Sequence, residues 1–260
     1  MCFKPIYLIK SLCFVLSILC VGTVVSFNLR ADTLYLTSLH WPPYSSQEFK
    51  HQGACVAVAR AALKAMGHEL VVDFYPWSRA KKLAKMSSSK YLGYFPEYSY
   101  QTQEFIFTDS MGSSPLGLVE RKSHPIRWHK VADLNQYYLG VVEGYVNTSE
   151  LDQMIASGDQ PVEVASSDIH NIQKVASARV QAAAIDTHVL RYLIAGKQFN
   201  STRSKLQINQ RLLGEKQLYI GFRNTAEGRR WRDIFDAGLA KIDTVAIMSQ
   251  HLPNSNVDRQ

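Results

Sequence analysis

The stretch that decides the fold starts at Gly93-Tyr94-Phe95-Pro96-Glu97-Tyr98 and ends at Val119-Glu120-Arg121-Lys122. It begins as a short strand, and Pro96 is expected to break that strand into a polar and aromatic loop. The chain returns to an apolar run at residues 105–109, meets Gly112-Ser113-Ser114-Pro115, and then resumes as a strand that ends in charge. A strand that leaves one body through a Gly/Ser/Pro break and enters a second body is what a two-lobed protein with a cleft needs.

A candidate return crossing lies later in the chain, at Gln217-Leu218-Tyr219-Ile220-Gly221-Phe222-Arg223. We therefore predict an α/β fold of two lobes, each with a parallel-type sheet and covering helices, joined by two hinge crossings. The predicted first lobe is discontinuous and comprises residues 32–115 and 218–260, whereas the second lobe comprises residues 116–217.

Both predicted lobes alternate strands and helices, which is typical of parallel sheets covered by helices. In the first lobe we expect strands at 33–37 and 70–74, with helices after Gly53 and after Pro76. In the second lobe we expect strands at 138–142, 162–165 and 180–185, helices between and after them, and then a strand at 206–210. A long final helix from about Ala226, with Trp231, Phe235 and Ile242 on one face, is expected to pack back on the first lobe.

The N-terminus has the pattern of an export signal. Lys4 and Lys10 precede an apolar run at residues 11–26, with small residues near its end, so cleavage after Ser26 or after Ala31 fits. The alternative, an uncleaved membrane anchor, requires the run to span a bilayer at its short limit. We therefore predict a signal peptide at residues 1–31 and a periplasmic location.

Charge and cysteine content exclude several classes of protein. Without the leader, which carries Lys4, Lys10 and Arg30, the net charge of +7 falls to +4, and no basic run interleaves with aromatic residues as in a nucleic-acid groove. Cys55 is then the one remaining cysteine, so we expect a buried thiol and no internal disulfide. We also expect a monomer with no cofactor and no metal.

Ligands in open α/β sheets bind beyond the carboxyl ends of the strands, and with two lobes these ends face each other across the cleft. This rule selects ten candidate ligand-binding residues from the predicted strand ends; the alternative for the aromatic ones is a place in the core. The candidates are Trp41, Tyr44, Trp77, Arg79, Tyr94, Phe95, Glu97, Tyr145, Asn147 and Asp186.

Two charged candidates have explicit alternatives. Arg79 pairs either with a substrate anion or with a local carboxylate such as Asp73. Asp186 follows an apolar run and so needs a partner if buried, but it can equally cap the helix that begins at Thr187. Glu97 and Asp186 would also suit an acid/base pair, although the sequence holds no other catalytic motif.

The order of motifs resembles that of the family 3 periplasmic solute-binding proteins, the amino-acid-type receptors of bacterial ABC importers. The resemblance extends over essentially the whole chain after the leader. The motifs that carry it are Trp41-Pro42-Pro43-Tyr44, Tyr75-Pro76-Trp77-Ser78-Arg79-Ala80, Gly93-Tyr94-Phe95-Pro96-Glu97-Tyr98, Phe105-Ile106-Phe107-Thr108-Asp109, Leu116-Gly117-Leu118-Val119-Glu120, Leu139-Gly140-Val141-Val142-Glu143-Gly144 and Gln181-Ala182-Ala183-Ala184-Ile185-Asp186.

The resemblance implies the two-lobed periplasmic binding protein fold, with a solute clamped between the lobes. It implies that the first-lobe aromatic loop stacks on the solute, that backbone N–H groups after Gly144 bind an anion, and that Asp186 binds an amino group. The family usually carries a carboxylate-binding arginine in a Thr-x-x-Arg motif, whereas this chain has Thr102-Gln103-Glu104-Phe105. The sequence therefore favours an amine-bearing solute over an ordinary amino acid, unless Arg79 replaces the missing arginine.

Three functions remain open at this stage. The first is a solute receptor for an ABC transporter permease. The second is an enzyme on the same fold, such as a dehydratase of cyclic acids, and the third is a ligand-sensing module of a membrane sensor protein.

Overall fold

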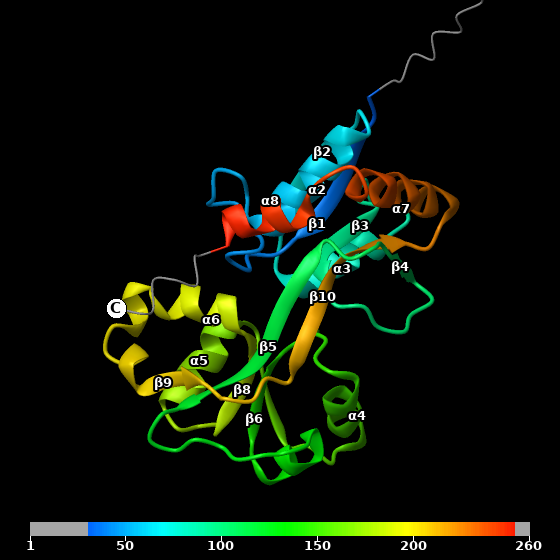
Figure 1. Ribbon diagram of the computed structural model, residues 1–260. Helices are drawn as coiled ribbons and strands as arrows, with labels where there is room; N and C mark the ends of the chain where they lie inside the picture. The colour runs from blue at the N-terminus through cyan, green and yellow to red at the C-terminus, as the bar shows by residue number, and fades with distance from the viewer. Residues whose placement is uncertain (1–30, 253–260) are drawn as a thin grey trace, which may run out of the picture. The chain divides into compact units, whose positions relative to one another are not determined.

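The computed structural model describes residues 31–252 (Figure 1). The predicted signal peptide lies almost entirely outside the described residues, as do residues 253–260. None of the helices within 31–252 has the length and the apolar character needed to cross a membrane. The described strands form one curled path in the order β2-β1-β3-β10-β5-β8-β6-β7, with β4 beside β10 and β9 beside β5.

One end of this sheet is built from parallel strands covered by helices, as the sequence predicts. β1 pairs in parallel with β2 and with β3. The helices α2 and α3 follow β1 and β2, and both pack on this part of the sheet. The elements are β1 (Thr33–Ser38), α2 (Ala54–Ala65), β2 (Glu69–Phe74), α3 (Trp77–Lys85) and β3 (Gly93–Glu97).

The other end repeats the arrangement. β6 pairs in parallel with β7 and with β8, and the helices between these strands begin at side-chain caps. Thr148 caps α4, Ser167 caps α5 and Asp186 caps α6. The elements are β6 (Leu139–Val142), α4 (Ser149–Ser157), β7 (Val162–Ala165), α5 (Asp168–Ala176), β8 (Ala182–Asp186) and α6 (Thr187–Ile194).

Two long antiparallel strands join the two ends, and Figure 1 shows them side by side, β5 in green and β10 in orange. β5 (Gly112–Arg121) pairs with β10 through its first half and with β8 from Leu116 onward. β10 (Gly214–Arg223) pairs with β5 up to Leu218 and then with β3 and β4 (Phe105–Phe107). Both lobe boundaries predicted from the sequence fall inside these two crossing strands, β5 and β10, and their exact positions stay a prediction.

Two predicted strand breaks are wrong. β3 runs through Pro96 to Glu97, because its pairing with β10 shifts register between Tyr94 and Glu97 and no regular ladder bond is needed there. β5 likewise runs through Pro115. β8 ends opposite Leu116, so Pro115 lies where β5 has a partner on one side only, and a missing N–H group is tolerated there.

The chain returns to the first lobe after β10. α7 (Ala226–Leu239) packs on α2 and β4, as predicted, although it ends before Ile242. α8 (Thr244–His251) lies against α2 and β5, with the Met248 side chain over Gly112. The remaining short elements are β9 (Leu206–Ile208) and the 3-10 helices η1 (Val131–Gln136), η2 (Lys197–Phe199) and η3 (Arg203–Lys205).

The loop after β1 is held tightly against the start of α2. The carbonyl oxygens of Pro43 and Tyr44 accept hydrogen bonds from the backbone of Ala54 and Cys55, at 3.0 and 2.9 Å. Gly53, at φ 101°, permits this approach, because a Cβ there would lie 2.5 Å from the Tyr44 oxygen. The aromatic loop is therefore fixed to a helix, and Cys55 is a buried free thiol, as expected.

Candidate functional site

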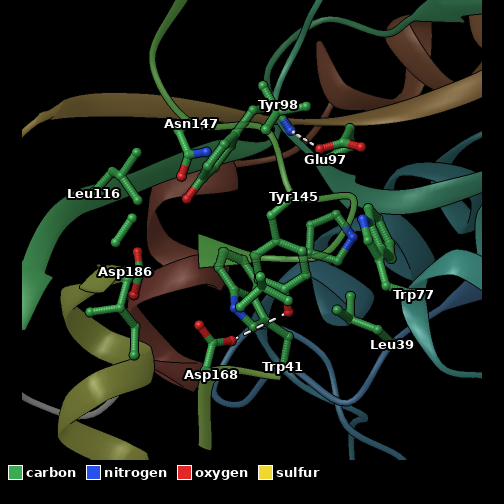
Figure 2. A pocket seen from close by; sticks show the side chains of 15 residues that line it. Leu39, Trp41, Trp77, Glu97, Tyr98, Leu116, Tyr145, Asn147, Asp168 and Asp186 are labelled. Carbon is green, nitrogen blue, oxygen red and sulfur yellow. Dashed lines mark hydrogen bonds between the residues drawn. The ribbon is translucent and has the colours of Figure 1, made fainter. Parts of the chain in front are cut away.

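A pocket lies where the carboxyl ends of β1, β3, β6 and β8 meet between the two lobes (Figure 2). The enclosed space is only about 30 Å³, roughly enough for a water molecule, so a larger solute requires the lobes to separate. Its charged lining residues are all acidic. The lining comprises Leu39, Trp41, Trp77, Pro96, Glu97, Tyr98, Leu116, Val142, Tyr145, Val146, Asn147, Asp168, Ala184, Ile185 and Asp186.

Aromatic side chains from both lobes build the walls. Trp41 and Tyr44 flank the two prolines of the loop after β1, and their rings stack with centroids 4.7 Å apart and planes inclined by 25°. Trp77 begins α3, meets Tyr145 edge-on at 6.2 Å and donates its indole N–H to the Gly144 carbonyl oxygen at 3.2 Å. Trp77 therefore connects the two lobes through both a ring contact and a hydrogen bond.

Asp186 is the best-satisfied carboxylate of the pocket, and it serves both as helix cap and as link between lobes. Its Oδ1 accepts from the Val189 backbone at 2.8 Å, which caps α6. Its Oδ2 accepts from the hydroxyls of Tyr44 at 3.0 Å and Ser114 at 2.5 Å, and Tyr98 in turn donates to Ser114 at 2.6 Å. Burial raises the pKa of Asp186, and these donors only partly offset the effect.

Asp168 has far fewer partners than Asp186. It lies in the first turn of α5, is 6 % exposed, and accepts one side-chain hydrogen bond, from the Tyr145 hydroxyl at 3.3 Å. Burial raises the pKa of Asp168 to about 7, and the nearby Asp186 charge adds to the increase, whereas Tyr145 and the Trp41 indole oppose it. The Trp41 N–H itself is buried and does not reach hydrogen-bond geometry with any described group.

Glu97 ends β3 in the first lobe and is 4 % exposed. One oxygen accepts from the Tyr98 backbone at 2.9 Å. The other forms no hydrogen bond and lies 3.5 Å from the Lys81 ammonium, which sits over the rings of Trp77, Tyr94 and Tyr100. Burial raises the pKa of Glu97 to about 7 even though Lys81 acts in the opposite direction.

The structure brings six of the ten sequence candidates into the pocket lining and places four elsewhere. Tyr44 lies behind Trp41 and reaches Asp186, whereas Tyr94 and Phe95 are fully buried beneath the pocket. Arg79 does not line the pocket; it is exposed, with its guanidinium carbon 5.1 Å from the Tyr75 ring centroid. The six lining candidates are Trp41, Trp77, Glu97, Tyr145, Asn147 and Asp186.

Arg79 therefore supplies no obvious replacement for the missing carboxylate-binding arginine. The alternative pairing with Asp73 is wrong, because Asp73 accepts from Tyr91 at 2.7 Å and pairs with Lys90 at 3.0 Å.

Asp168, Tyr98 and Lys81 were missed by sequence reasoning. Ser167-Asp168 is an ordinary helix-start pattern, so Asp168 is not among the sequence candidates. Its place after β7, at the carboxyl end of a parallel strand, is the signal that would have found it. Lys81 was hidden in a basic helix whose exposed lysines look alike in sequence.

The anion-binding backbone implied after Gly144 is not free. Helix α4 starts only at Ser149, and the chain's own Asp152 accepts from both the backbone and the side chain of Asn147, at 2.9 and 2.8 Å. The Leu151 N–H donates to Thr148. Within 31–252, no cluster of three or more His, Cys, Asp or Glu side chains is placed to hold a metal ion.

Compared with protein-family models and with curated protein sequences, the chain matches none. Solved structures do resemble it. A histidine kinase sensor domain with similarity to periplasmic binding proteins has a TM-score of 0.71 at 16% identity, over 85% of this chain and 95% of that one. An ancestral arginine-binding protein bound to arginine has a TM-score of 0.65 at 17% identity, over 84% and 96%.

The substrate-binding protein of an amino acid ABC transporter is also similar, with a TM-score of 0.63 at 12% identity, over 84% of this chain and 96% of that one. The resemblance seen in the sequence motifs is thus confirmed at the level of fold. The chain has the two-lobed fold of the periplasmic binding proteins.

Proposed function

We propose that this chain is an exported solute-binding protein that closes its two lobes on a small solute carrying an amino group and serves an ABC importer. The observation that carries the proposal is the meeting of acidic and aromatic side chains from both lobes in one pocket. Buried carboxylates favour a cation that neutralises them, and indole and phenol rings attract the same cation through their faces. The export signal predicted from the sequence supports a periplasmic location for such a receptor.

A sensor role is the second candidate. It is favoured by the likeness to a histidine kinase sensor domain, which has a higher TM-score than the two binding proteins described above. Both roles need the same solute-dependent closure, and they differ in the membrane partner. Co-purification of the ligand-loaded chain with detergent-solubilised membranes distinguishes a permease from a kinase-type partner.

A thermal-shift screen tests the proposed binding function. The chain from residue 32 onward is unfolded, dialysed and refolded to remove carried-over solute, then heated with amino acids, polyamines, organic acids and sugars. A solute at a hundredfold excess over its dissociation constant stabilises the native state by about 2.7 kcal/mol. For a chain of this size the melting temperature should rise by roughly 5–10 °C with a cationic amine.

Organic acids serve as the matched negative set, because no basic side chain lines the pocket. Stabilisation by organic acids or sugars but not by amines would contradict the proposal, and so would the absence of any hit. Chemical consumption of the bound solute would instead identify an enzyme that uses Glu97 or Asp168 as its acid or base.

A further inference from the structure

We infer that the solute is a linear dication of the α,ω-diamine class, with no carboxylate, whose two cationic ends meet acids from the two lobes. This inference rests on the proposed solute-binding function and narrows it to a substrate class. Two observations support it: the acidic side chains of the pocket are divided between the lobes, and the pocket lining has few free hydrogen-bond donors.

The acids of the pocket are divided between the lobes. Glu97 comes from β3 in the first lobe, whereas Asp168 and Asp186 follow β7 and β8 in the second. In Figure 2, Asp168 and Asp186 lie on one side of the pocket and Glu97 on the other. A solute with one cationic group can neutralise one side only, whereas a solute with two separated cationic groups neutralises both.

On each side the protein supplies only long-range pairing: Lys81 forms an ion pair with Glu97, but at the long end of the range. Lys81 lies 3.5 Å from Glu97, beyond the 2.7–2.9 Å that is usual for a charge-assisted hydrogen bond, and the nearer oxygen makes no hydrogen bond at all. On the second-lobe side, Asp168 accepts a single hydroxyl hydrogen bond at 3.3 Å. Each side therefore holds a buried carboxylate whose protein partner lies farther away than in a short charge-assisted hydrogen bond, and a solute ammonium group supplies three donors at closer range.

A solute carboxylate would find almost no donor in this pocket. Tyr145 already donates to Asp168, and Tyr98 donates to Ser114. Asn147 donates to Asp152, and the Trp77 indole donates to Gly144. The side-chain donors of the described lining that are left over are the Trp41 N–H and the second amide hydrogen of Asn147, and two neutral donors do not offset three acids.

The walls between the acids suit a methylene chain. Apolar side chains also line the pocket, among them Leu39, Leu116 and Ile185. An adjoining cavity of about 420 Å³ shares Trp41, Trp77, Tyr145 and Asp168 with the pocket, which gives a longer chain room past the rings. The acidic side chains that line that cavity are Asp168 and Glu48, and apart from His40 its lining holds no basic residue.

The test compares three probes of equal chain length by isothermal titration calorimetry at pH 7.5. Cadaverine is the diamine, lysine is cadaverine with a carboxylate added, and n-pentylamine is cadaverine with one amine removed. We expect cadaverine to bind at least about tenfold more tightly than either of the others, since each of them loses one favourable pairing or adds one buried anion.

The Glu97→Gln variant shows whether the second cationic end is used. Its affinity for cadaverine should fall by roughly 30-fold or more, whereas its affinity for n-pentylamine should change less than about threefold. If the variant does not fold, the comparison of the three probes on the wild-type protein still tests the inference. Tighter binding of lysine, or equal binding of n-pentylamine, overturns the diamine inference but leaves the proposed function standing. No binding of any probe at millimolar concentration contradicts both.

Discussion

At pH 7.5 the Asp168→Asn variant is expected to melt roughly 5–10 °C above the wild-type chain, which corresponds to about 2–4 kcal/mol of added stability. The reason is the buried charge. The pKa of Asp168 is about 7 in the native protein because burial and Asp186 both disfavour the charged form. In the unfolded chain the carboxyl ionises near pH 4.

The sign follows from proton binding. Between about pH 4 and pH 7 the native carboxyl keeps a proton that the unfolded chain releases, so raising the pH over this range favours unfolding. The penalty is complete above pH 7 and absent below pH 4. Asparagine keeps an oxygen for the Tyr145 hydroxyl, carries no charge and so escapes the penalty.

Melting curves at pH 4 and pH 7.5, without solute, measure this difference. The gap between variant and wild type should nearly close at pH 4, where Asp168 is protonated. The exposed Asp159→Asn variant is the matched control and should melt within about 2 °C of wild type at both values. A variant that melts below wild type at pH 7.5 contradicts this account of Asp168.

Asp186→Ala is expected to have the opposite effect, with a loss of about 3 kcal/mol in the free energy of unfolding. The alanine removes the cap of α6, leaves the Ser114 hydroxyl without its acceptor, and leaves the Tyr44 hydroxyl with only the Ser113 carbonyl oxygen at 3.4 Å. Loss of a cap costs about 1 kcal/mol, and each buried polar group left unsatisfied costs about 1–3 kcal/mol.

Urea denaturation measures the effect, and Asp186→Asn is its control. The amide oxygen can still accept from Val189, while the amide nitrogen can donate to the hydroxyl oxygens, so most of the loss should be recovered. Equal losses for Ala and Asn would show that the charge, and not the set of hydrogen bonds, is what Asp186 contributes.

Most of the fold could be predicted from the sequence because local signals and tertiary packing agree. Apolar runs of strand length and the helical spacing after Gly53 each have one natural interpretation. The strand breaks predicted at Pro96 and Pro115 are wrong because a strand tolerates a proline wherever it lacks a partner on one side or its pairing shifts register. That depends on β8 and β10, which are distant in sequence.

The site was less accessible to prediction. The strand-end rule brought Trp41, Glu97 and Asp186 to one pocket, since it depends only on where strands stop. The strand-end rule does not predict whether a side chain at the start of a helix points into the pocket or toward solvent. Arg79 therefore turned out to be exposed, and Asp168 turned out to be buried in the pocket wall. Whether the predicted residues bind a solute stays a prediction.

The measurement that tests the central claim most directly is the affinity of the strongest amine hit for wild type and for Asp168→Asn, by titration calorimetry at pH 7.5. The variant is expected to be the more stable protein, so lost binding cannot be attributed to unfolding. If the pocket between the lobes is the binding site, affinity should fall by roughly 30-fold or more, as when one partner of a buried charge pair is removed. Unchanged affinity would place the amine elsewhere and contradict the account.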